Sequence, residues 1–125
     1  MFRALEINRS CYSIEKSMIW AIIRTQKEGY HFWGQAPKGV EFLRKIHRHI
    51  FWVELWIEQK HTKRDVEYIS EKRKLERFLG RQHLEGGFSC EDLASIILNH
   101  WEHLYPNRKI KVFVFEDNEN GTMVE

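Results

Sequence analysis

The most regular pattern of hydrophobic and polar positions in this chain lies at residues 47–58. Successive side chains of a β-strand point to opposite faces, so every second residue of this segment would share a face. One face would carry an apolar ladder of Phe51, Val53, Leu55 and Ile57. A helix would scatter these residues around its surface, so the pattern predicts a strand. His47 and His49 begin the same face and would project from it side by side.

A second strand is predicted upstream of this one. Residues 18–25 are rich in β-branched and aromatic side chains, which favour strands. We expect the strand to continue through a bulge near Gly29 to Trp33. Residues 34–39 contain glycine and proline and predict a loop. A short strand is also expected at residues 3–8.

Two segments downstream have helical periodicity. Residues 66–79 carry an uneven apolar stripe, and Gly80 is a suitable helix stop. Ser89 is a suitable N-cap for the next helix, because Asp92 follows three residues later as in a capping box. We expect this second helix to bury Leu93, Ile96, Ile97, Trp101 and Leu104.

The chain ends in a predicted hairpin. Residues 110–115 alternate as a strand, and residues 118–121 suit a turn into a last strand at residues 122–125. The order strand–strand, helix–helix, strand–strand predicts an α+β fold with two helices on one face of an antiparallel sheet. With 125 residues the chain fits one domain over residues 1–125, of which residues 1–16 form an N-terminal extension.

Composition narrows the class of protein. Hydrophobic residues make up 42% and aromatic residues 14%, which favours a folded chain over a disordered one. The 20 Lys and Arg residues are interleaved with 18 Asp and Glu residues, for a net charge of +2, so we expect no direct binding of nucleic acid. There are two cysteines without a Cys-x-x-Cys motif, and we find neither a signal sequence nor an apolar run of membrane-spanning length. We therefore expect a soluble, cytoplasmic protein that does not contact membranes.

The His-x-His pair at the start of the long strand is the main candidate for chemistry. Two imidazoles on rigid, same-face positions supply two of the three ligands of a three-histidine zinc site. The alternative is that His47 and His49 are polar residues at the solvated end of a strand. The fragment alone leaves both interpretations open.

Four short motifs follow one another in the order known from one protein family. They are His31, the His-x-His of residues 47–49, the helix start at residues 88–94, and the strand of residues 112–116 that ends in Glu116. Over about residues 17–125, and in its ββααββ order, the chain resembles the family of 6-pyruvoyltetrahydropterin synthase and 6-carboxytetrahydropterin synthase. In place of the Gly usual in the family's His-Gly-His, this chain has Arg48.

The resemblance implies a fold, an assembly and a site. The fold is the tunnelling fold, in which subunits join their sheets into a barrel, so a homo-oligomer is expected. His31, His47 and His49 match the zinc ligands of the family, and Glu116 matches the acid that anchors a pterin or purine-like ring. The family's pocket lies at a subunit interface, so the resemblance allows Glu116 to belong to a site whose metal is bound by the neighbouring chain.

Two parts of the family's acid–base machinery are changed in this sequence. The family's catalytic cysteine lies a few residues before the His-x-His motif, whereas residues 42–46 contain no thiol. His83 loosely matches the family's Asp-His pair between the helices, and is either a general acid or base or an exposed loop residue. Cys90 at a helix N-terminus is expected to have a lowered pKa, or else to be a simply buried thiol.

Glu116 also has two interpretations. A carboxylate accepts two hydrogen bonds at once and can hold two ring N–H groups of a guanine-like edge. Alternatively Glu116 is a strand-end acid that pairs with Lys109 or Lys111.

Three functions follow from these alternatives. The first is a zinc-dependent, lyase-type enzyme that acts on a pterin or a related purine-derived ring. The second is a non-catalytic protein that binds a pterin, deazapurine or nucleotide in the same pocket. The third is an interaction protein whose pocket is degenerate.

Overall fold

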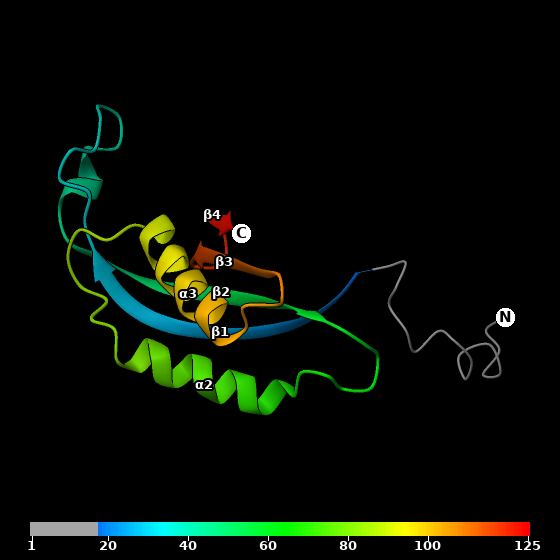
Figure 1. Cartoon of the computed structure of the whole chain (residues 1–125). Helices are drawn as coiled ribbons and strands as arrows, with labels where there is room; N and C mark the ends of the chain where they lie inside the picture. Colours follow the sequence, from blue (N-terminus) through cyan, green and yellow to red (C-terminus); the bar gives the residue numbers. More distant parts are fainter. Residues whose placement is uncertain (1–17) are drawn as a thin grey trace, which may run out of the picture.

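The computed structural model describes residues 18–125 (Figure 1), so the strand expected at residues 3–8 and Cys11 lie outside the described residues. Its sheet has four strands in the order β1-β2-β3-β4, and all neighbours are antiparallel. The strands are β1 (Ile19–His31), β2 (His47–Gln59), β3 (Ile110–Glu116) and β4 (Gly121–Val124). Helices α2 (Tyr68–Gly80) and α3 (Cys90–Leu104) lie between β2 and β3 in the chain, which confirms the predicted α+β fold and its ββααββ order.

Strands β1 and β2 pair without interruption over their whole length, and β1 ends at His31. The expected bulge near Gly29 was therefore wrong. Gly29 is instead a point of close approach, because a Cβ there would lie 2.9 Å from a ring atom of Phe51 and 3.0 Å from the Cβ of Leu84. The carbonyl of Leu84 also accepts the Tyr30 N–H at 2.8 Å. The loop after α2 thus lies against β1 near the histidines.

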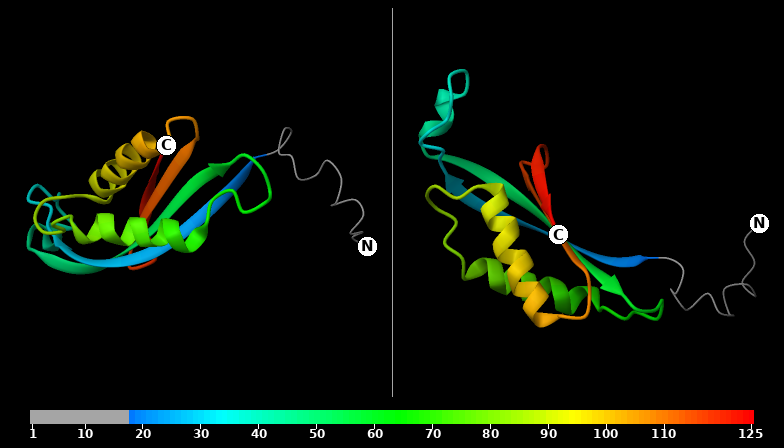
Figure 2. Two further views of the ribbon diagram at one scale, coloured as in Figure 1. Left: turned by 60° about the horizontal axis from the view of Figure 1, so that its bottom comes forward. Right: turned by 45° about the horizontal axis from the view of Figure 1, so that its top comes forward.

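Both helices lie on one side of the sheet, as Figure 2 shows from two directions. The predicted stop of the first helix at Gly80 is confirmed. The predicted capping box of α3 is also confirmed: Ser89 Oγ accepts the Asp92 N–H, and the Asp92 carboxylate accepts the Ser89 N–H, each at 3.0 Å. None of the helices within residues 18–125 is long and apolar enough to cross a membrane.

The buried stripe of α3 is narrower than expected. Leu93, Ile97 and Trp101 are buried as predicted, but Ile96 and Leu104 are 45% and 44% exposed, so the prediction was wrong for these two. A helix turns by about 100° per residue, which places Ile96 more than a quarter-turn from the centre of the buried stripe. Leu104 is the last residue of the helix.

The two faces of the sheet differ in what covers them. On β2 the predicted apolar ladder is fully buried against the helices, at Phe51, Val53, Leu55 and Ile57. The opposite face carries Trp52 and Trp56. The Trp56 ring lies 6.0 Å from Trp20 and 5.0 Å from Phe113 across neighbouring strands. This second face has no helix over it and carries both aromatic side chains and ion pairs, such as Arg24 with Glu54.

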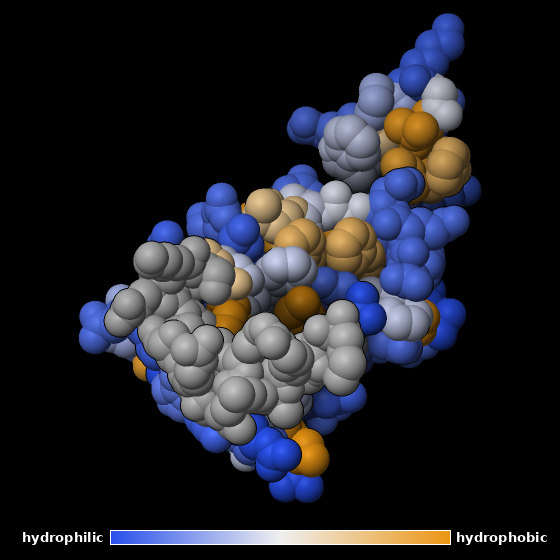
Figure 3. Space-filling model, turned by 90° about the vertical axis from the view of Figure 1, so that its right-hand side faces the viewer, coloured by the Kyte–Doolittle hydropathy of each residue, from blue (hydrophilic) through white to orange (hydrophobic). Residues whose placement is uncertain are grey.

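Between β1 and β2, residues 32–46 leave the sheet as a projecting loop that contains the short helix η2 (Glu41–Arg44). The Trp33 N–H donates to the Leu43 carbonyl at 2.7 Å, and Arg44 Nε donates to the Ala36 carbonyl at 2.8 Å. Hydrophobic side chains gather at the top of the molecule, where this loop projects (Figure 3). Phe42 on this loop is 71% exposed.

Candidate metal centre

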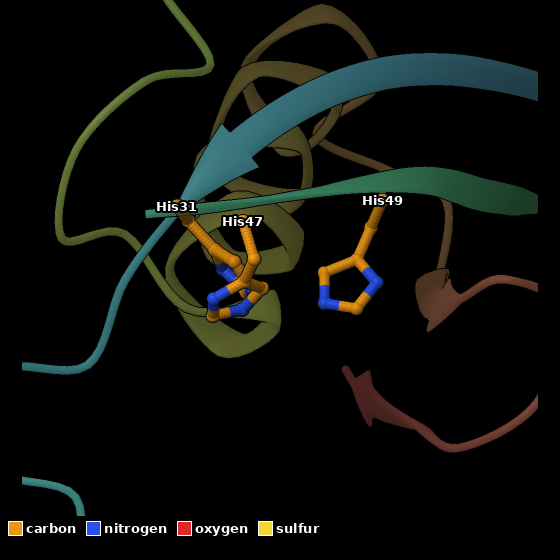
Figure 4. A group of neighbouring side chains, drawn as sticks. All are labelled: His31, His47 and His49. Carbon is orange, nitrogen blue, oxygen red and sulfur yellow. The ribbon is translucent and has the colours of Figure 1, made fainter. Parts of the chain in front are cut away.

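Three histidines meet at the end of the β1–β2 ladder. The strand register places His31 directly opposite His47, and His49 is two residues further along β2. Because side chains two residues apart share a face, all three project toward the side that the helices cover. Figure 4 shows the three rings projecting from the same side of the two strands.

The three rings are close enough to share one ion. Their centroids lie 4.6 Å (His31 and His47), 5.0 Å (His31 and His49) and 4.9 Å (His47 and His49) apart. One nitrogen of each ring lies within 4.8 Å of the other two. Nitrogens around a tetrahedral zinc ion lie about 3.3 Å apart, given Zn–N bonds of about 2.0–2.1 Å. Each pair therefore has to approach by at most about 1.5 Å, which side-chain rotation can supply.

Each imidazole is oriented through its Nδ1 atom. His31 Nδ1 lies 2.9 Å from the Phe88 carbonyl, His47 Nδ1 lies 2.8 Å from the Lys45 carbonyl, and His49 Nδ1 lies 2.6 Å from a carboxylate oxygen of Asp117. These oxygens only accept hydrogen bonds, so each Nδ1 must carry the proton and donate it. In the neutral ring the Nε2 lone pair is then free for a metal, which is the arrangement typical of metal-binding histidines.

Two further observations fit a metal at this point. His49 Nε2 is buried and has no hydrogen-bond partner among residues 18–125. A buried polar atom without a partner costs free energy, and a bound cation would remove that cost. Burial also lowers the pKa of His31, which favours the neutral form that binds metals.

Asp117 is a site residue that the sequence analysis missed. Its backbone N–H donates to the Ile50 carbonyl at 2.8 Å, and its Oδ1 accepts the Ile50 N–H at 2.9 Å, so Oδ2 is left to hold His49. Asp117 and Asn118 both have positive φ, at 51° and 58°, as the two central residues of a type I′ hairpin turn require. Aspartate and asparagine tolerate positive φ. The Asp117-Asn118 dipeptide between two predicted strands is therefore the signal in the sequence that could have identified this turn.

Glu116 lies beside the histidines of its own chain. Its Oε2 is 3.1 Å from His31 Nε2 and 3.8 Å from His49 Nε2, and the side chain is 34% exposed. Glu116 therefore reaches a candidate metal site within its own chain, without a neighbouring subunit. The alternative pairing with a lysine was wrong. Lys111 points to the opposite face, where it lies 3.5 Å from Glu125, and Lys109 lies beyond the far end of β3.

A cavity of about 520 Å³ opens next to the cluster. This volume is typical of small-molecule sites. Among its lining residues are His31, His47 and Glu116, together with the aromatic side chains of Phe32, Trp33 and Phe88. The cavity therefore offers flat apolar walls, one carboxylate and two of the three imidazoles to the same ligand.

The other candidate residues are placed less favourably. Cys90 lines the cavity but is buried, and its pKa is raised to about 12 by burial and by the nearby Glu116 carboxylate. The expected lowering of its pKa was wrong, because burial outweighs the helix dipole, and the thiol stays protonated at neutral pH. His83 is exposed and does not line the cavity, so its role as a general acid or base stays a prediction. Leu43, from the segment of residues 42–46 that contains no thiol, also lines the cavity.

The remaining histidines lie away from the cluster. His100 stacks on Phe78 with ring centroids 4.6 Å apart, and His103 hydrogen bonds to the Asn99 carbonyl at 2.7 Å. His61 lies 3.5 Å from Asp65 at the other end of the sheet. These three histidines therefore take no part in the cluster.

The chain matches no protein-family model, and no curated protein is significantly similar to it in sequence.

Proposed function

We propose that this protein is a zinc-dependent enzyme of the 6-pyruvoyltetrahydropterin and 6-carboxytetrahydropterin synthase type, with lyase-type chemistry on a pterin or a related purine-derived ring. The observation that carries the proposal is the cluster of three histidines, each with its Nδ1 hydrogen bonded and its Nε2 left for a metal. Zinc bound by three histidines keeps a coordination position for substrate, where it polarises a carbonyl or hydroxyl group or lowers the pKa of a bound water.

The residues around the cluster suit a flat, nitrogen-rich ring. The Glu116 carboxylate can accept two N–H groups of a guanine-like edge. Phe32, Trp33 and Phe88 line the same cavity, and aromatic side chains pack well against planar rings.

The second candidate is a non-catalytic binding protein for a pterin, deazapurine or nucleotide. Three observations favour it over the enzyme: Leu43 stands in the segment of the missing cysteine, Cys90 has a pKa of about 12, and His83 does not line the cavity. Both candidate functions use the metal and the ring-binding residues. They differ in that the enzyme also needs a group that transfers protons.

We also propose that copies of the chain join into a barrel with the tunnelling fold. The uncovered face of the sheet carries large apolar side chains, including Ile22, which is 44% exposed, and Met123, which is 43% exposed. Strands β1 and β4 are the sheet edges, and closing a barrel removes such edges. Light scattering on the purified protein tests this, since the mass of a monomer would contradict it.

Metal analysis tests the first requirement of both candidates. Protein purified without chelator is expected to contain close to one zinc per chain, and treatment with a chelator is expected to lower its melting temperature. Replacement of His47 by Ala should abolish both effects, whereas replacement of the distant His103 by Ala should abolish neither. Metal-free wild-type protein that does not respond to added zinc would contradict both candidates.

Incubation with dihydroneopterin triphosphate and related guanine-derived compounds separates the two candidates. Mass spectrometry after incubation with the zinc-loaded protein is expected to show a product that has lost part of its side chain. A ligand that is retained by the protein but unchanged in mass would contradict the enzyme and support the binding protein.

A further inference from the structure

We propose that Glu116 is a fourth ligand of the metal in the ligand-free protein, so that the incoming ring must displace this carboxylate from the metal. The inference rests on the metal site of the proposed function and gives Glu116 a second role besides holding the ring. Glu116 would then occupy the fourth coordination position of the zinc ion until a ligand displaces it.

The distances around Glu116 support a fourth corner. Its Oε2 lies 3.1 Å from His31 Nε2 and 3.8 Å from His49 Nε2. Ligand atoms around a tetrahedral zinc ion are about 3.3 Å apart, since Zn–N and Zn–O bonds are both about 2.0–2.2 Å. The carboxylate oxygen is thus already separated from two of the nitrogens by about the edge of such a tetrahedron.

The surroundings of Glu116 leave it no other cation. Within residues 18–125 its recorded ion-pair contacts are with His31 and His49 alone. Both imidazoles carry their proton on Nδ1, because their Nδ1 atoms face oxygens that only accept. In the metal-bound protein their Nε2 atoms therefore offer no proton to Glu116, and the carboxylate is left with the metal and with the weak donor of the Cys90 thiol, which hydrogen bonds to it.

Charge also favours this ligand set. The side chains of His31 and His49 are only 10% and 18% exposed, so a divalent ion held by neutral histidines would carry its full charge into a partly buried site. Burying an unpaired charge is costly. One carboxylate ligand halves the net charge of the centre, and Glu116 is the acid that faces the Nε2 atoms of His31 and His49.

The same carboxylate is free enough to leave. The Glu116 side chain is 34% exposed and lines the cavity, so rotation of the side chain can turn its oxygens from the histidines toward the cavity. A ring with two N–H groups would donate both of them to the rotated carboxylate. An oxygen of the same ligand would then occupy the position that Glu116 has left on the metal. Small anions without such N–H groups would have to compete with Glu116 for the metal.

Cobalt-substituted protein tests the proposal, because Co²⁺ reports its ligands in the visible spectrum. Wild-type protein should bind cobalt and show little change in its spectrum when azide is added. Glu116→Ala should bind cobalt at least roughly tenfold more weakly, and azide should now bind to the metal and change the spectrum. Glu116→Gln, which keeps the size of the side chain, should behave as Glu116→Ala does.

Glu119→Ala is the matched control. Glu119 is an exposed acid on the same hairpin, and only its backbone N–H contacts Glu116, at 2.9 Å from the Glu116 carbonyl. This variant should keep the wild-type response to azide. Tight azide binding by wild-type cobalt protein would overturn the proposal and leave the proposed function standing. Failure of wild-type protein to bind cobalt or zinc would overturn both.

Discussion

The two ends of the β1–β2 ladder are built on opposite principles. At the end away from the histidines, polar groups satisfy one another. Arg108 holds both carboxylate oxygens of Asp65, at 2.6 and 3.1 Å, and also donates to the Glu58 carbonyl at 3.0 Å. Asp65 in turn accepts the Lys60 N–H at 2.6 Å. These contacts fasten the loop after β2 to the loop before β3.

At the histidine end the polar groups are oriented but not satisfied. Each Nδ1 is held by an oxygen, whereas the buried Nε2 of His49 has no hydrogen-bond partner in residues 18–125. Aromatic side chains that line the neighbouring cavity remain exposed, including Trp33 at 52%. One end therefore contributes stability by itself, and the other end is arranged to gain stability from something that binds there. Variants at the two ends should respond differently to metal.

The largest difference is expected for the loss of a histidine. His49→Ala should remove the stabilisation by zinc, which for a one-site ligand at a hundredfold excess over its Kd is about 2.7 kcal/mol. Urea unfolding of wild-type and variant protein with and without zinc measures it. A variant that zinc still stabilises as strongly as wild type would show that the cluster is not the binding site.

Arg108→Met should destabilise the protein by about 2 kcal/mol, because it leaves the poorly exposed Asp65 carboxylate without its charged partner. In contrast to the histidine variant, the loss should be the same with and without zinc. If zinc raised the unfolding free energy of Arg108→Met by more than that of wild type, the two ends would be linked energetically.

Acid should weaken the contacts of Asp65. The hydrogen bonds from Arg108 lower the pKa of Asp65 from 3.8 to about 2. Because the folded-state pKa is below the unfolded one, this stabilisation is present above about pH 4 and is lost as the pH falls toward about 2. It amounts to at most roughly 2 kcal/mol, less what solvent screening removes. Unfolding free energies of Asp65→Asn should fall less steeply over that range than those of wild type.

A smaller loss of metal binding than that of the histidine variant is expected at Asp117. Asp117→Ala removes the oxygen that orients His49, and loss of such a supporting group typically weakens metal binding about 10- to 100-fold. Asp117→Asn keeps an oxygen that can accept the Nδ1 proton and should recover part of the affinity. Zinc titrations against a competing chelator measure both. Equal affinities for wild type and Asp117→Ala would exclude an orienting role.

The strands, the cap of α3 and the His47–His49 pair could be predicted because each depends on local rules, whereas His31 was added to the pair only through the family resemblance. Alternation placed His47 and His49 on one face, and the Ser89 and Asp92 spacing identified the start of α3. These features need only the geometry of one element.

The rest depends on how elements meet. That Glu116 lies beside His31 follows from the register of β3 on β2, with Glu116 opposite Phe51, and alternation alone leaves that register open. Asp117 has the ordinary appearance of a turn residue until the hairpin is placed next to His49. The exposure of Ile96 depends on how α3 is rotated against the sheet, which its apolar residues do not determine.

The uninterrupted pairing of β1 with β2 has a consequence for folding. A slip of one residue between two strands reverses the face of every side chain in the moved strand. Such a slip in β1 would turn Ala21 and Ile23 out of the core and take His31 away from His47 in the same step. Correct packing of the core and assembly of the three-histidine cluster are thus decided by one alignment. Metal binding by the cluster would therefore report that the two longest strands have folded in the right register.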